Sequence, residues 1–120
     1  MLPARNRMRR SADFGFTVRS GVRAAQPDLV VHVNRQMRTA ASDSPQIGLI
    51  VTKSVGGSVA RHRVARKLRH AARDVLAELG PTDRIVIRAL PSSRDASLSR
   101  LEQQLRAGVR RASNLMARTT

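Results

Sequence analysis

The sequence predicts a small α/β layer fold in a single domain. Its 120 residues suit one compact unit. A β-branched run, a long amphipathic run and a second β-branched run follow one another, as expected for a strand–helix–strand unit. Hydrophobic residues make up 41% of the chain, which is enough for a modest core, and the absence of cysteine excludes disulfides.

The N-terminal third predicts a flexible segment, a short helix and a strand. Residues 1–10 are basic and lack a regular apolar pattern, so we expect them to be flexible. Ser11 can cap a helix through the stretch SADFGFTVRSG, which ends at Gly21. The stretch DLVVHVNR, residues 28–35, is rich in β-branched residues and predicts a strand. Small and polar residues over 36–46 then predict a loop.

The middle of the chain predicts a buried strand followed by a long helix. The stretch IGLIVTK, residues 47–53, is nearly all apolar, which favours burial on both faces. The turn SVGGS follows, and its last residue, Ser58, is suited to cap a helix. We expect this helix over residues 59–79, because Gly80 and Pro81 then end the periodic pattern.

The C-terminal third predicts a strand, a turn and a final helix. The stretch DRIVIRAL, residues 83–90, predicts the strand, and PSSRDAS predicts the turn. The helix should start near Ser97 or Ser99, and Ser99 with Glu102 has the spacing of a capping box. The apolar stripe of this helix consists of Leu98, Leu101, Leu105, Val109, Ala112, Leu115 and Met116.

The charge of the chain indicates a polyanionic partner. Twenty-three Lys and Arg face eight Asp and Glu, for a net charge of +15, and 21 of the cations are Arg. Arginine grips phosphates with a planar fork, and an excess this large repels itself unless an anion neutralises it. Nucleic acid is the first candidate and an anionic membrane the second, with a generally basic protein as the plain alternative.

The cations concentrate on the predicted long helix. Residues 61–73 hold five Arg, one Lys and two His, with no acid until Asp74. At helical spacing, Val64 and Leu68 lie on the apolar stripe, while the cations lie mainly on the opposite face. A solvated face would alternate in sign, and a membrane-surface helix would carry aromatic residues. The pattern therefore favours a folded helix that binds a polyanion.

The glycine turn before this helix supports the same interpretation weakly. Glycines allow close backbone approach to a phosphate, and the free N–H groups at a helix start favour anions. Two glycines before a helix are more often simply a turn. Their position beside Lys53 and Arg61 adds weight to the functional interpretation.

The residues show no catalytic constellation. The eight acids are scattered, and the three histidines lack a spaced carboxylate or nucleophile. His62 lies among arginines and is more simply an RNA contact than a metal ligand. Phe14 and Phe16 are the only aromatic residues, which excludes a multi-ring stacking platform. Without a catalytic constellation, we do not expect the protein to be an enzyme by itself. No apolar run of about 18 residues and no secretory signal are present, so we expect a cytoplasmic protein.

These residues resemble the protein subunit of bacterial ribonuclease P. That family has a Lys-x-x-Gly-x-x-Val stretch before a basic helix, and here KSVGGSV, residues 53–59, leads into Arg61-His62-Arg63. The stretches ADFGFTVRSG, IGLIVTK and DRIVIRAL are similar to the first helix, the central strand and the last strand of the family. The resemblance covers residues 5–116 in the family's order.

The resemblance implies an α/β fold of the α+β sandwich type, with a small mixed sheet and three helices in the order α-β-β-β-α-β-α. This order includes one strand before the long helix that the residue patterns do not reveal. The family also contains a left-handed βαβ crossover, which the general handedness rule would not predict. The whole chain, residues 1–120, would form a single RNA-binding domain.

The resemblance also implies a function. In this family the catalytic subunit is an RNA that uses Mg²⁺, mainly RNA-bound, to remove the 5′ leader of precursor tRNA. The protein binds the RNA subunit through the basic helix and holds the leader between the sheet and the first helix. The implied partners are the RNA subunit and precursor tRNA, with no membrane and no obligate protein partner.

The resemblance matches individual RNA-binding positions of the family to residues of this chain. The surface for the RNA subunit would consist of Lys53, Arg61, His62, Arg63, Arg66, Lys67, Arg69 and Arg73. Phe14, Val18 and His32 would line the leader cleft. Three features depart from the family. His62 replaces an asparagine, Ala65 stands where a cation is common, and Val18 and His32 stand where aromatic residues are common.

Two other functional classes fit part of the pattern. A ribosomal-type protein would bind one RNA without changing a reaction. A DNA-binding regulator would place the basic helix in the major groove. The regulator is disfavoured because strands flank the basic helix and no second helix lies a few residues before it. Preference for a structured RNA over duplex DNA at matched salt would separate these classes.

Overall fold

The sheet of this protein has four strands in mixed orientation. The computed structural model describes residues 2–35 and 44–119. Within them the strands are β1 (Val22–Ala25), β2 (Leu29–Arg35), β3 (Gln46–Ile50) and β4 (Asp83–Ala89). Their spatial order is β1-β2-β4-β3, with two antiparallel pairs and a parallel β3–β4 pair. β1 is the extra strand that the resemblance implied.

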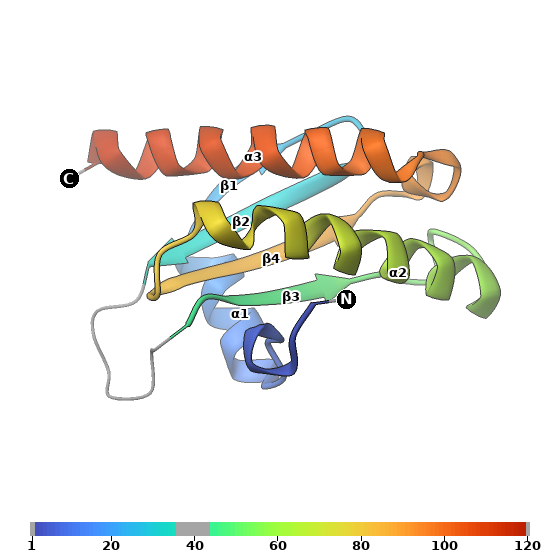
Figure 1. The fold of residues 1–120 in the computed structure, drawn as a ribbon, viewed down its shortest axis with the longest axis horizontal. Coiled ribbons are helices and arrows are strands. Elements are labelled where there is room, and N and C mark those ends of the chain that lie inside the picture. Colours follow the sequence, from blue (N-terminus) through green and yellow to red (C-terminus); the bar gives the residue numbers. More distant parts are fainter. Residues whose placement is uncertain (1, 36–43, 120) are drawn as a thin grey trace.

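Three α-helices cover the two faces of this sheet (Figure 1). They are α1 (Ser11–Ser20), α2 (Ser58–Val75) and α3 (Leu98–Thr119). Three short 3₁₀ helices lie at Ala4–Asn6, Leu76–Glu78 and Pro91–Asp95. α2 and α3 pack side by side on one face, and α1 lies alone on the other. The element order implied by the resemblance is confirmed.

The connection from β3 through α2 to β4 is a crossover between neighbouring parallel strands. In Figure 1, β3 lies below β4, both strands run to the right, and α2 returns to the left in front of them. This path is left-handed, whereas about 98% of such connections are right-handed. The handedness places the basic helix along the β3 edge of the sheet.

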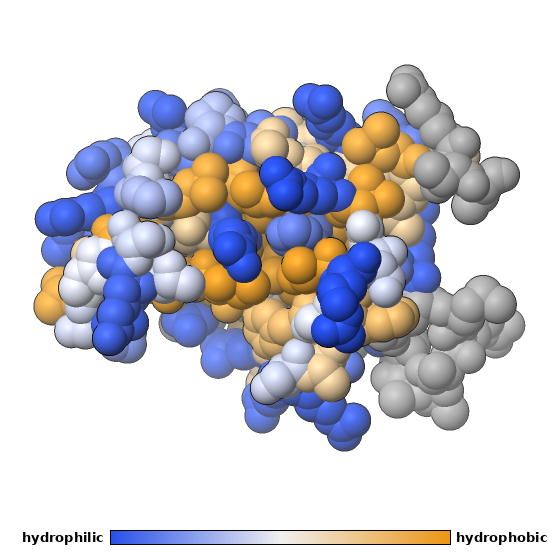
Figure 2. Space-filling model, turned by 180° about the vertical axis from the view of Figure 1, so that it is seen from behind, coloured by the Kyte–Doolittle hydropathy of each residue, from blue (hydrophilic) through white to orange (hydrophobic). Residues whose placement is uncertain are grey.

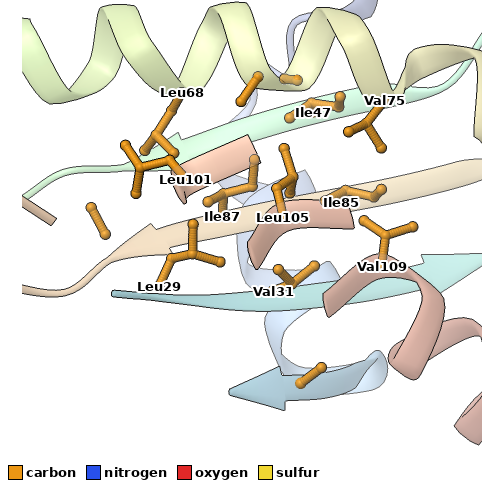
Figure 3. Packing of buried hydrophobic residues seen from close by; sticks show 14 of the residues in the cluster. Leu29, Val31, Ile47, Leu68, Val75, Ile85, Ile87, Leu101, Leu105 and Val109 are labelled. Carbon is orange, nitrogen blue, oxygen red and sulfur yellow. The ribbon is translucent and has the colours of Figure 1, made fainter. Parts of the chain in front are cut away.

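The core lies between the sheet and the α2–α3 layer. Alternating strand residues point towards these helices, so Val31 and Ile87 are register partners and both are fully buried. From the helices, Leu68 and Leu105 fill the same space (Figure 3). The predicted apolar stripes of both helices are therefore the packed faces, as their three- and four-residue spacing indicated.

A buried carboxylate ties α3 to the strands. Asp28 immediately precedes β2, and its carboxylate accepts hydrogen bonds from Ser92 Oγ at 2.6 Å, Arg100 Nε at 2.7 Å and Gln104 Nε2 at 2.6 Å. Its own N–H donates to Gln104 Oε1 at 2.8 Å, and its carbonyl accepts from Leu90 N at 3.0 Å. One residue therefore joins two turns and the first half of α3.

Several predicted element ends need correction. β3 ends at Ile50 rather than residue 53, because the chain turns before α2. α2 ends at Val75 rather than residue 79, because its last turn tightens into a 3₁₀ helix. Ser58 is the first helical residue and not the cap. The capping box is wrong, because it is Ser97 Oγ that accepts from Arg100 N, at 3.1 Å.

The N-terminal segment, for which the sequence predicts flexibility, is packed against the sheet from residue 2 onwards. Leu2 and Met8 are buried, and Met8 N donates to Ile47 O at 2.9 Å. Asn6 Nδ2 also donates to Pro45 O at 2.8 Å. Most of the predicted loop over residues 36–46 lies outside the described residues, and Gln46 is already in β3.

We predict that Asp28→Asn destabilises the fold by about 1–3 kcal/mol, because an amide NH2 would replace one of two accepting oxygens and the charge that pairs with Arg100 would be lost. Urea unfolding at pH 7 measures this change, with Ser99→Asn, at an exposed site of α3, as the control.

Hydrogen bonds from Ser92, then Gln104 and Arg100, lower the pKa of Asp28 against the opposing effect of burial. Its contribution is therefore full above pH about 4 and is lost as pH falls through the lowered pKa. A variant as stable as the parent would contradict this role.

Candidate nucleic-acid interface

The outer face of α2 presents a row of cations. His62, Arg63, Arg66 and Arg73 are exposed, while Val64 and other residues of the apolar stripe are buried. Successive cations three or four residues apart lie about 5–6 Å from one another on a helix. Such a row repels itself in isolation, so α2 depends on its packed face for stability.

In the part of the chain that the structure describes, no cation of α2 forms an ion pair. Among the described residues, every ion pair involves Arg35 or an arginine of α3. Arg100 pairs with Asp28, while Arg106 and Arg110 both pair with Glu78. The described acids therefore pair three arginines of α3 and leave the α2 cations available to an external polyanion.

Lys67 differs from the other cations of α2. It is half-buried, and its Nζ donates a hydrogen bond to Ala96 O at 3.0 Å. This contact joins α2 to the turn before α3. Lys67 therefore lies on the α3 flank of the helix, with its ammonium partly occupied by the fold.

The turn before α2 places a further cation near the helix start. Lys53 is exposed in this turn, and Gly56 has φ +148°, a conformation that favours glycine. Gly57 then caps the helix without a side-chain hydrogen bond. Lys53 and the first cations of α2 thus lie at one end of the helix.

The residues expected to line a leader cleft lie on the other face of the sheet, which is the α1 side. α1 crosses this face, and the ring of Phe14 lies directly over Gly48 of β3, where a Cβ would approach it to under 3.0 Å. Val18 follows one turn later on α1 and is half-buried. Figure 2 shows apolar atoms across this face with strongly hydrophilic groups standing among them.

His32 lies on this face of β2, between Arg23 of β1 and Val86 of β4 in the strand register. It is buried, and its Nδ1 has no hydrogen-bond partner among the described residues. Burial, followed by the charges of Arg88 and Arg23, lowers the pKa of His32. The neutral imidazole is therefore favoured, and it has unused hydrogen-bonding capacity.

Sequence reasoning missed two cations of this face. Arg23 and Arg88 are both exposed and lie close enough to His32 to affect its pKa. Alternation along DRIVIRAL could have found Arg88, because it places this residue on the face opposite Ile87. Arg23 lies in β1, a strand that the patterns did not reveal.

The structure thus separates the expected site residues into two groups. The α2 cations lie on the helical side of the sheet, and Phe14, Val18 and His32 lie on the α1 side. The groups meet at the β3 edge, where Arg69 and Phe14 line one small hollow with Leu49. Among the described residues, no helix has both the length and the hydrophobicity needed to cross a membrane.

Sequence comparison gives consistent matches. The family model described as Ribonuclease P matches residues 2–113. A Mycobacterium ulcerans protein named Ribonuclease P protein component is 64% identical over 112 residues, covering 93% of each chain. A Mycobacterium tuberculosis protein of the same name is 57% identical over 115 residues, covering 96% of each chain.

Structural comparison supports the same fold. A Staphylococcus aureus RNase P protein superposes with a TM-score of 0.77 at 20% identity, over 89% of this chain and 94% of that one. An RNase P protein from Thermotoga maritima gives 0.69 at 17% identity, over 82% and 90%. The arrangement of the mixed sheet and three helices is thus shared with these proteins.

We predict that Gly48→Ala destabilises the protein by about 1–3 kcal/mol, because the new methyl group would overlap the Phe14 ring. Gly80→Ala is the matched control, since a Cβ there meets only Asp83 Oδ2, at an ordinary contact distance of 3.8 Å. Thermal and urea unfolding of both variants measure the difference. Equal stability of the two variants would show that Phe14 does not pack on β3.

We predict that stability falls as pH drops below about 6.5, the ordinary pKa of histidine. With the folded pKa of His32 lowered, the unfolded chain binds the proton first, so stability is lost from 6.5 downwards. His32→Gln should flatten this part of the pH profile in urea unfolding. An unchanged profile would contradict burial of a neutral His32.

Proposed function

The chain belongs to the ribonuclease P protein family, and from this premise we propose which of its surfaces bind RNA. As a member, it is part of the ribonuclease P holoenzyme, which acts with an RNA subunit in the processing of tRNA 5′ ends. We propose that the outer face of α2 binds the RNA subunit. We propose further that the α1 side of the sheet holds the 5′ leader of precursor tRNA.

The unpaired cations of α2 carry the first part of this proposal. Arg63, Arg66 and Arg73 are exposed and have no ion pair among the described residues. Arginine forks bind phosphate oxygens bidentately, and each such contact releases counterions from RNA. Lys53, Arg61, His62 and Arg69 extend the surface, while Lys67 contributes mainly to packing.

The α1 side of the sheet offers a different kind of RNA contact. Phe14 supplies a ring on which a base can stack, and His32 supplies a neutral imidazole with a free nitrogen. Arg23 and Arg88 flank the imidazole and suit a phosphate backbone. A single strand with splayed bases matches this mixture better than a duplex does.

The protein's contribution to cleavage is electrostatic and organisational. Binding the RNA subunit on one face and the leader on the other lowers the repulsion between two polyanions. We propose that the Mg²⁺ used in cleavage is held mainly by RNA. The donor chemistry supports this, because the two surfaces supply guanidinium and imidazole groups, whereas Mg²⁺ prefers carboxylate and phosphate oxygens. We propose a cytoplasmic location, where the precursor tRNA substrate would be met.

The α2 assignment predicts a loss of cleavage at low magnesium. A variant with Arg61, Arg63, Arg66 and Arg69 all changed to Ala should fail to rescue precursor-tRNA cleavage by the cognate RNA subunit. For a single change, Arg66→Ala should reduce the salt slope of RNA-subunit binding by about one unit.

Arg111→Ala is the matched control, since Arg111 is an exposed arginine of α3. It should leave the salt slope nearly unchanged. Equal effects of Arg66→Ala and Arg111→Ala would show that the affinity comes from general charge and not from α2. Unimpaired rescue by the fourfold variant would contradict the assignment outright.

The leader assignment predicts a selective defect. Arg88→Ala should weaken holoenzyme binding of precursor tRNA by about tenfold or less, the effect of one phosphate contact. Binding of mature tRNA, which has no leader, should stay unchanged. A defect of equal size with both tRNAs would place Arg88 outside the leader path.

A further inference from the structure

A hollow lies between the first half of α2 and the end of β3. Its volume is about 310 Å³, at the lower end of the range of small-ligand sites. It is lined by Leu49, Val51, Ser58, Arg61, His62 and Ala65, together with Arg69. β3 is an edge strand of the sheet, so the hollow opens at the edge of the molecule.

The floor and the walls of this hollow differ in chemistry. The floor consists of Leu49 and Val51, which pack against the hydrophobic core, and of the Ala65 methyl group from α2. The walls are two guanidinium groups, an imidazole and the Ser58 hydroxyl. No carboxylate lines it, so the described protein itself offers these cations no counterion there.

Arg61, which lines the hollow, has a buried N–H group without a hydrogen-bond acceptor among the described residues. This group is the Nε–H of its guanidinium. A buried guanidinium N–H without an acceptor costs free energy, and most such groups in proteins are paired. The described fold gives this guanidinium no acceptor at Nε, and a phosphate oxygen fits the fork of a guanidinium group.

We propose that this hollow takes one unstacked nucleotide of the RNA subunit. The base lies on Leu49, Val51 and Ala65, and the phosphate is bound by Arg61 and Arg69. An inorganic anion would leave the apolar floor bare, and an apolar side chain would leave both guanidinium groups unpaired. The proposal rests on the proposed binding of the RNA subunit by α2.

Ala65 makes a selective test possible. It is the smallest side chain in the floor, and it is half-buried on the pocket side of α2. Ala65→Leu fills the hollow, keeps every charge and retains a strong helix former. Ala107→Leu makes the same change at an exposed site of α3 and serves as the control.

The experiment uses the full chain with the cognate RNA subunit, first without and then with leader-bearing precursor tRNA. Base-specific methylation should reveal a base that the wild-type protein protects and Ala65→Leu exposes. Affinity for the RNA subunit should fall about tenfold, as expected for loss of one base's apolar burial. The salt slope should stay unchanged, because no cation is removed. Ala107→Leu should match the wild type in all three measurements.

Wild-type affinity and an unchanged footprint with Ala65→Leu would overturn the proposal. Protection that appears only with leader-bearing precursor tRNA would also overturn it, since the nucleotide would come from the leader. Circular dichroism verifies folding, and Ala65→Met, with a more flexible side chain, replaces Ala65→Leu if that variant does not fold. Failure of the wild-type protein to bind the RNA subunit would instead refute the proposed function of α2.

Discussion

The positions of a few carboxylates determine which arginines of this protein are paired within the fold and which remain available to a partner. The chain has eight acids for 23 cations, and among the described residues the acids that form ion pairs are Asp28, Glu78, Asp83 and Glu102. Three of these four neutralise arginines of α3, and the fourth pairs with Arg35 of β2. Helix α3 can therefore pack with most of its charge balanced. Within residues 2–35 and 44–119, helix α2 receives no ion pair, so a polyanion lying against it would lower the repulsion among its cations.

Much of this fold could be predicted from residue patterns alone. The two long helices follow from apolar residues at three- and four-residue spacing, and β2 and β4 follow from β-branched runs. β1 could not be predicted in this way, because its four residues, VRAA, have no clear alternation. The left-handed crossover came from the family resemblance, since local sequence does not encode handedness. Packing of the N-terminal segment depends on Ile47 and Pro45, far along the chain.

The residues of the candidate site could also be predicted in part from the sequence. Exposed cations opposite an apolar stripe identified the outer face of α2, because a helix fixes which side chains share a face. The same reasoning could not show that Lys67 bonds to the carbonyl of Ala96, a residue that only the tertiary fold brings near. Nor could it place Arg23 beside His32, because that contact requires the β1–β2 register. The sequence therefore predicts which side chains share a face of one helix or strand, but it does not predict which side chains of two different elements come into contact.

The β3 strand explains why the two proposed RNA surfaces belong to one structure. Successive residues of a strand point to opposite faces, so Gly48 lies under Phe14 on the α1 side while Leu49 lies beside Arg69 on the α2 side. A single residue step thus connects the side proposed for the leader to the side proposed for the RNA subunit. Because β3 is paired with β4 on one edge and contacted by the N-terminal segment on the other, its register is fixed from both sides. A shift of this strand by one residue would exchange the two faces, and both surfaces would be lost together.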